Sequence, residues 1–184
     1  MNINLNIVAS RALIFLSLLL VSNAVMAEIK IELTGGAGRY ALDVDRKFAP
    51  QIEDDSTVAN FSVGVYKSSA VDASWGAVIE YSLPIGRDSD LPGNGRLLGF
   101  RPVNYLVRYS KEISVEYYAG IGQFDWTKTA NGYYFGFNVR YDIFAENAGI
   151  MTDFKYYQDL AFDSAEGDDI VDGFNSSLKF YYNF

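Results

Sequence analysis

Charged side chains recur at every second position in several stretches of the sequence, where they alternate with large apolar residues. Arg140 and Asp142 do so in one stretch, and Asp153 and Lys155 do so in another. Because side chains two positions apart in a β-strand share a face, these charges would line one face of a sheet. In a narrow interior with little water, isolated charges are costly and must pair. The predicted network consists of Glu32, Glu80, Arg108, Glu116, Arg140, Asp142, Asp153, Lys155 and Lys179, and Lys30 and Asp159 share its face.

Two uses of this network stay open at this point: a structural core of ion pairs, or a gated path for ions or protons. Catalysis is disfavoured because the chain contains no His and no Cys. A His general base and a Cys nucleophile are therefore impossible, and no Ser-Lys arrangement stands out. We expect no catalytic site, no metal site and no cofactor.

The last stretch of the chain, Gly173–Phe184, shows the same alternation of apolar and polar residues. One parity of this strand is apolar and is interrupted only by Ser176; its members are Phe174, Leu178, Phe180, Tyr182 and Phe184. The other parity is polar. Such alternation at period two predicts a strand whose two faces meet different environments.

The same alternation predicts eight strands, joined by connections that are alternately long and short. This is the pattern of an up-and-down transmembrane β-barrel, with short turns at one end and long loops at the other. The apolar pattern predicts a change of parity at the glycines of residues 35–38, and a bulge or twist is expected there. The expected long loops are Asp43–Ser56, Pro84–Gly95, Asp125–Gly132 and Asp163–Asp172.

Periodicity alone does not say which face points inward, so a secreted barrel with an apolar interior is the main alternative. The apolar rows carry five or six large residues per strand, more than a narrow lumen can hold. We therefore predict that they face lipid and that the charges face the lumen. Aromatic residues make up 16 % of the chain. They are expected as belts at both membrane interfaces, with Tyr40 at the outer rim.

The first 27 residues are predicted to be a cleaved export signal, which leaves Glu28–Phe184 as the barrel domain. Arg11 is the only charge there, Ala12–Val21 is a short apolar core, and small residues precede Glu28. The formal net charge of −8 disfavours a nucleic-acid partner.

Acidic residues gather in the last expected loop, at Asp163, Glu166, Asp168, Asp169 and Asp172, with Asp54 and Asp55 in the first. Oxygen-rich loops can hold Ca²⁺ or Mg²⁺, but EF-hand spacing is missing. Solvated, mutually repelling loops are the favoured interpretation.

The C-terminal pattern Phe180-x-Tyr182-x-Phe184 resembles the terminal strand of bacterial outer-membrane β-barrels, where it closes the barrel and is read by the insertion machinery. The whole mature chain resembles the eight-stranded barrels of the OmpA/OmpX type. This resemblance implies an outer-membrane location in contact with lipid and lipopolysaccharide, and loops that meet an unidentified surface ligand. A structural or surface-interaction role is expected. A small pore is the alternative, and an enzyme acting on lipid is the weakest one.

Overall fold

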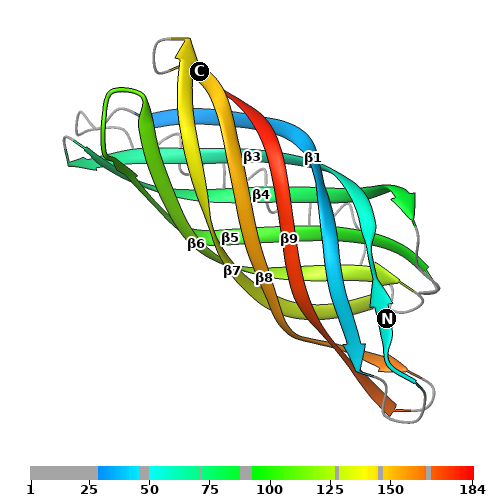
Figure 1. Ribbon diagram of the computed structural model, residues 1–184. Helices are drawn as coiled ribbons and strands as arrows, with labels where there is room; N and C mark the ends of the chain where they lie inside the picture. Colours follow the sequence, from blue (N-terminus) through cyan, green and yellow to red (C-terminus); the bar gives the residue numbers. More distant parts are fainter. Residues whose placement is uncertain are drawn as a thin grey trace.

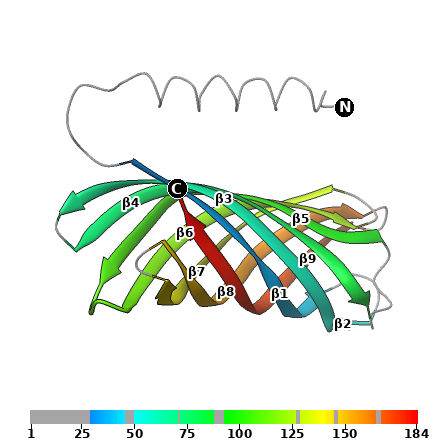
Figure 2. The ribbon, with the colours of Figure 1, turned by 90° about the horizontal axis from the view of Figure 1, so that it is seen from above.

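The computed structural model describes residues 29–45, 50–70, 72–87, 93–126, 129–144, 147–164 and 167–184. In these ranges, one antiparallel sheet closes on itself because β1 pairs with both β3 and β9 (Figures 1 and 2). The predicted eight-stranded barrel is thus confirmed. The spanning strands are β1 (Ile29–Asp45), β3 (Ser56–Ala70), β4 (Ala73–Arg87), β5 (Gly93–Arg108), β6 (Ile113–Trp126), β7 (Thr129–Phe144), β8 (Ala148–Ser164) and β9 (Gly167–Asn183).

A short strand, β2 (Ile52–Asp54), pairs with the far end of β1. No helix in the described ranges has the length and hydropathy needed to cross a membrane. The predicted export signal, residues 1–27, lies outside the described residues.

The barrel has two unlike ends. At the turn end, β3–β4, β5–β6 and β7–β8 are joined by short connections, and the start of β1 lies beside Phe184. The backbone N–H of Phe184 donates to the carbonyl of Ile31 there, at 2.9 Å. At the hairpin end, β1–β3, β4–β5, β6–β7 and β8–β9 are joined.

The strands are longer than the sequence suggested. They run for 14 to 17 residues, whereas about 9–11 residues suffice to cross a bilayer. The prediction of four long loops was therefore wrong, since most of these segments extend the hairpins. Asp43 pairs with Asp172, and Asp163 pairs with Asp168, in continuous ladders. The polar side chains of these segments suggest loops in the sequence. Their backbone groups nevertheless form hydrogen bonds with a neighbouring strand.

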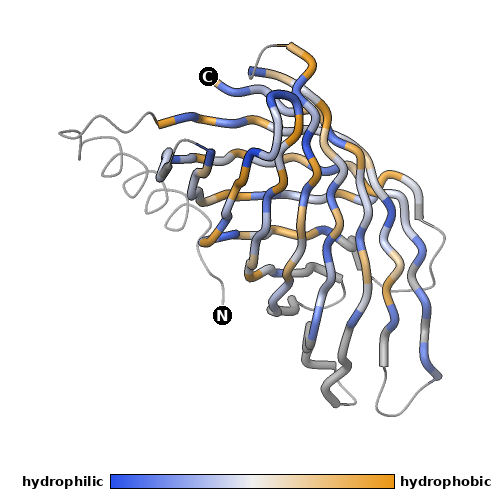
Figure 3. Tube along the Cα trace, turned by 60° about the vertical axis from the view of Figure 1, so that its left-hand side comes forward, coloured by the Kyte–Doolittle hydropathy of each residue, from blue (hydrophilic) through white to orange (hydrophobic). Residues whose placement is uncertain are grey.

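The two faces of each strand differ in polarity as predicted. Along β7, Phe135, Phe137 and Val139 are 49 %, 41 % and 39 % exposed on the outside, while Asn138 and Arg140 are buried in the lumen. Figure 3 shows hydrophobic and hydrophilic positions alternating along the strands. Large apolar side chains thus cover the outer wall, as lipid contact requires.

The expected bulge at the first glycines is not there. The β1–β9 pairing runs without a shift from Glu32–Asn183 to Asp45–Ile170. A Cβ atom on Gly38 would lie only 2.4 Å from the Cβ of Ser177, so the glycine is needed for close approach at this seam. Because parity is kept, Tyr40 points into the lumen and is 1 % exposed. Its expected place in an outer aromatic belt was wrong.

The irregularity of β5 has a definite cause. The register with β6 shifts between Phe100 and Val103, around Pro102. Leu98 and Phe100 therefore face outward on one parity, and Val103 faces outward on the other. This bulge turns Arg101 into the lumen, where it is 2 % exposed.

Candidate functional site

The lumen contains a balanced set of charges. In the part of the chain that the structure describes, the buried anionic and cationic side chains are equal in number, at four each. Such balance is required because an uncompensated buried charge is costly. The anions are Glu32, Glu80, Glu116 and Asp153, and the cations are Arg101, Arg140, Lys155 and Lys179.

One ionic group, the Arg140 cluster, lies towards the turn end. The Arg140 guanidinium forms a fork on Glu32, with Nη1–Oε2 at 2.6 Å and Nη2–Oε1 at 2.8 Å. Its Nη2 also donates to Glu116 Oε2 at 2.7 Å. Tyr66 and Asn138 each donate to Glu116 at 2.6 Å. One cation therefore holds two carboxylates: Arg140 bonds both oxygens of Glu32, and Glu116 is bonded in addition by two neutral donors.

The second group, the Glu80 cluster, lies deeper in the lumen. Glu80 accepts a hydrogen bond from Lys155 and lies 3.7 Å from Arg101 Nε. Lys179 Nζ lies 2.5 Å from Asp153, which also accepts the hydroxyl of Tyr118. The guanidinium of Arg101 stacks over the Tyr118 ring at 4.3 Å, which is a cation–π contact.

Towards the hairpin end the lumen is packed mainly with aromatic and aliphatic side chains, beside the buried polar residues Ser56 and Asn175. The Tyr40, Tyr134 and Tyr157 rings meet edge to face, with centroids 5.9 Å and 5.8 Å apart for the two pairs that share Tyr157. Leu42, Leu97 and Val58 are as buried as these rings. We call these six residues the apolar plug. Beyond the ionic groups, the lumen is thus filled by packed side chains.

Glycines on neighbouring strands make room for the lumen tyrosines. A Cβ on Gly120 would lie 2.6 Å from the Tyr134 ring, and one on Gly76 would lie 2.4 Å from the Tyr66 ring. Gly76 and Gly120 therefore leave the space that these aromatic rings occupy.

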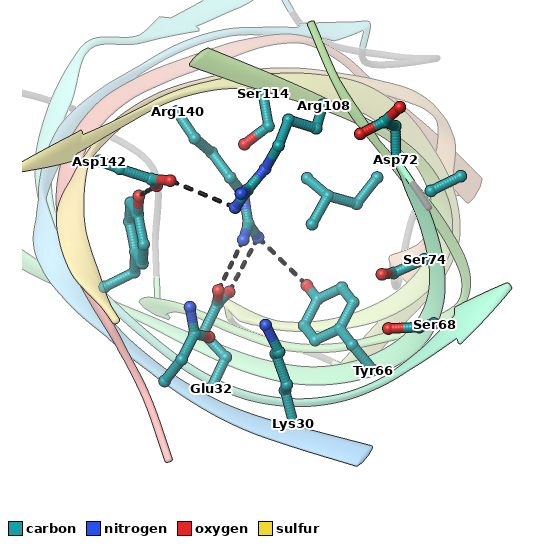
Figure 4. A pocket seen from close by; sticks show the side chains of 14 residues that line it. Lys30, Glu32, Tyr66, Ser68, Asp72, Ser74, Arg108, Ser114, Arg140 and Asp142 are labelled. Atoms are coloured by element: carbon teal, nitrogen blue, oxygen red, sulfur yellow. Dashed lines mark hydrogen bonds and ion pairs between the residues drawn. The ribbon is translucent and has the colours of Figure 1, made fainter. Parts of the chain in front are cut away.

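The turn end opens into a polar cavity of about 250 Å³ (Figure 4). Arg108 lies 3.4 Å from Asp142 at this mouth, and the Tyr181 hydroxyl donates to the same carboxylate. Lys30 lines the cavity beside Glu32. The Arg108 side chain is 31 % exposed, so this pair is wetter than the ones below it.

The structure therefore brings most of the predicted network together, in two clusters and a mouth pair. The side chain of Asp159 lies outside the described residues. Arg101 was missed by the sequence analysis. Strict alternation, counted back from the inward-facing Asn104, places Arg101 on the outer wall. The change of apolar parity from Leu98 and Phe100 to Val103 was the signal that could have identified it.

The C-terminal residues Phe180, Tyr182 and Phe184 face outward, at 67 %, 49 % and 69 % exposed. The rings of Tyr182 and Phe184 pack edge to face at 4.8 Å. The polar face of β9 meets the lumen instead, and Lys179 lies on it.

The fold was compared with known proteins. No family model matches the sequence, and no curated protein matches it either. Among solved structures, neisserial surface protein A (NspA) is similar over 86 % of this chain and 99 % of its own, at 9 % identity and a TM-score of 0.51. The chain has the fold of the small outer-membrane β-barrels. This likeness concerns the fold alone.

Two further barrels give lower scores. Ail, the attachment invasion locus protein of Yersinia pestis, is 13 % identical over 85 % of this chain and 99 % of its own, with a TM-score of 0.49. The N-terminal barrel domain of Pseudomonas aeruginosa OprF is 12 % identical over 86 % of this chain and all of its own (100 %), with a TM-score of 0.48.

Proposed function

We propose that this protein is an integral barrel of the bacterial outer membrane whose lumen is closed and whose role is structural or surface-interacting. The outer wall supports the membrane location because large apolar side chains cover it on every spanning strand. Exposure of such a large apolar surface to water would be unfavourable, whereas contact with lipid is favourable. In this setting the turn end faces the periplasm and the hairpin end faces outward.

The observation that carries the closed lumen is its filling in successive layers. An ion entering from the mouth first meets Arg140, held by two carboxylates, and then the Glu80 cluster. Beyond these lies the apolar plug, whose members are at most 1 % exposed. Conduction would require separating buried ion pairs and then crossing an apolar layer, and both steps are costly.

Conductance in planar bilayers tests this proposal. The purified barrel is expected to show no steady single-channel openings. Steady openings whose ion selectivity changes with Arg140→Glu would overturn the closed lumen and establish the alternative, a small pore.

The surface role is proposed from the hairpin extensions. Asp172, Asp43 and Glu53 lie directly opposite one another on β9, β1 and β2, and so form a row of carboxylates on one face. This row repels polyanionic ligands. The contribution of this row to partner binding is tested with the double variant Asp43→Asn, Asp172→Asn, by measuring adhesion of cells that display the barrel. Unchanged adhesion would argue for a purely structural role.

Two further roles remain proposals. Residues 1–27 are an export signal, so mass spectrometry of the mature protein should find Glu28 as the first residue. Retention of the first 27 residues would contradict this. Phe180, Tyr182 and Phe184 form the assembly signal for the insertion machinery. Phe184→Ala should lower the amount of folded barrel in the outer membrane without affecting refolding in detergent.

A further inference from the structure

The outer wall has a hollow that extends over three neighbouring strands, β1, β9 and β8. It is a shallow groove of about 380 Å³ with a mainly apolar lining. Ala37, Ser176 and Thr152 are short outward side chains, and on β9 and β8 they stand in rows that otherwise carry large apolar ones. Phe154 and Leu178, 44 % and 53 % exposed, form the walls. The gap in the apolar row at Ser176 is therefore a shaped feature of the surface.

A cationic side chain lies at one end of this groove. Arg39 lines it and is opposite Ser176 in the β1–β9 pairing. Its side chain is 67 % exposed and forms a two-pronged ion pair with Asp55, which is 49 % exposed. Ser176 and Thr152 are exposed on the same outer side of the wall.

The position of Arg39 along β1 matches a membrane boundary. Ile31 and Leu33 face outward before it, and Asp43 faces outward after it. The stretch from Ile29 to Ala37 is close to the roughly 9–11 residues that cross the hydrocarbon. Arg39 thus lies at the level of lipid headgroups, and the groove extends from it into the hydrocarbon.

We infer that this groove binds one phosphate-bearing membrane lipid, with an acyl chain along Ala37, Ser176 and Thr152 and the phosphate on Arg39. A guanidinium binds phosphate through the same fork that it uses for a carboxylate. The phosphate therefore competes with Asp55 for Arg39, and Asp55 holds Arg39 in place when no lipid is bound. The inference rests on the proposed transmembrane location.

Native mass spectrometry of the barrel released from detergent micelles tests this site. The micelles contain either phosphatidylglycerol or diacylglycerol with identical acyl chains, so the two lipids differ in the phosphate headgroup. The intact barrel should retain one phosphatidylglycerol at about tenfold lower lipid concentration than diacylglycerol, as expected for a charge-assisted contact.

Four variants separate the explanations. Arg39→Gln should abolish the preference for phosphatidylglycerol, and Asp55→Asn should increase it by removing the competitor. Ser176→Leu fills the groove and should reduce retention of both lipids. Arg96→Gln, which removes another exposed cation near the hairpin end, should change nothing.

Equal losses in Arg39→Gln and Arg96→Gln would overturn the site, because they indicate non-specific charge attraction. A dimer that disappears in Ser176→Leu would also overturn it, because a second copy would then occupy the groove. Each variant is also run on a heat-shift gel, in which a folded barrel migrates differently before and after boiling. This control shows that the variant is folded. A folded wild-type barrel that retains phosphatidylglycerol and diacylglycerol equally refutes the site alone. A wild-type chain that stays in solution without detergent refutes the membrane location itself.

Discussion

The two ends of the lumen are closed by different means. Towards the turn end, closure depends on charge: Arg140 holds Glu32 and Glu116 within 2.8 Å. Towards the hairpin end, closure depends on packing, with Tyr157 and Leu42 in the apolar plug. The ionic closure is lost when a buried charge loses its partner. The packed closure is lost when a cavity opens.

This difference shows how a narrow barrel can be both polar inside and stable. The ionic layers keep the inner wall compatible with a wet mouth, while the plug keeps water from passing the whole length. Breaking either closure separately should therefore cost stability by a different amount and through a different cause.

The largest effect is expected from Arg140→Ala. It leaves Glu32 and Glu116 buried without their cation, which should lower the free energy of unfolding by about 3–5 kcal/mol. Urea titration in detergent micelles, followed by tryptophan fluorescence, measures this loss. The matched control is Arg108→Ala at the mouth, with one carboxylate at 3.4 Å and 31 % exposure, where about 0–1 kcal/mol is expected. Equal losses for the two arginines would contradict the difference between a buried cluster and a wet pair.

The next effect tests the packed end. Leu42→Ala removes a side chain that is 1 % exposed and leaves a cavity in the plug, at a cost of about 2–4 kcal/mol. Because Leu42 and Arg140 belong to different layers, the double variant should lose the sum of the single losses to within about 0.5 kcal/mol. A clear departure from additivity in the same titration would show that the two ends are one coupled unit.

A smaller effect concerns the glycines that leave space for the lumen tyrosines. Gly120→Val places a side chain where the Tyr134 ring lies 2.6 Å from the Cβ position, and overpacking of this kind costs about 1–3 kcal/mol. The temperature at which the heat-shift gel changes should fall, and adding Tyr134→Leu should restore part of it. Gly86→Ala is the control, since its Cβ would meet Thr57 at an ordinary 3.7 Å. A drop as large for Gly86→Ala would refute this role of Gly120.

Sequence reasoning succeeded where a single periodicity decides the structure. Alternation at period two identified the strands, and the bulk of the apolar rows chose the outer face, which put Glu32, Arg140 and Lys155 inside. It failed where the period is broken or where both faces are apolar. Arg101 depends on one extra residue at a bulge, whose position is set by pairing with β4 and β6. Tyr40 and Leu42 look like outward residues because an apolar plug has the same composition as a lipid-facing row.

The prediction of loops in the hairpin extensions failed for another reason. Strand pairing is made by the backbone, so Asp43 and Asp172 can continue a ladder although their side chains suggest a loop. Ion-pair partners are likewise set by the closure of the barrel: Arg140 and Glu32 are separated by 108 residues in the chain. The alternation of the sequence therefore predicts that such residues face the lumen, but it does not predict which of them form ion pairs.

The central claim is that the apolar wall faces lipid and the ionic wall faces the lumen. Because the chain contains no Cys, single spin labels can be attached at Phe137→Cys on the outer wall and at Lys111→Cys in an exposed turn. In lipid vesicles, relaxation of the Phe137 label should respond to oxygen and not to a water-soluble nickel complex, and the Lys111 label should respond to nickel. A Phe137 label that nickel reaches as readily as it reaches Lys111 would contradict the account.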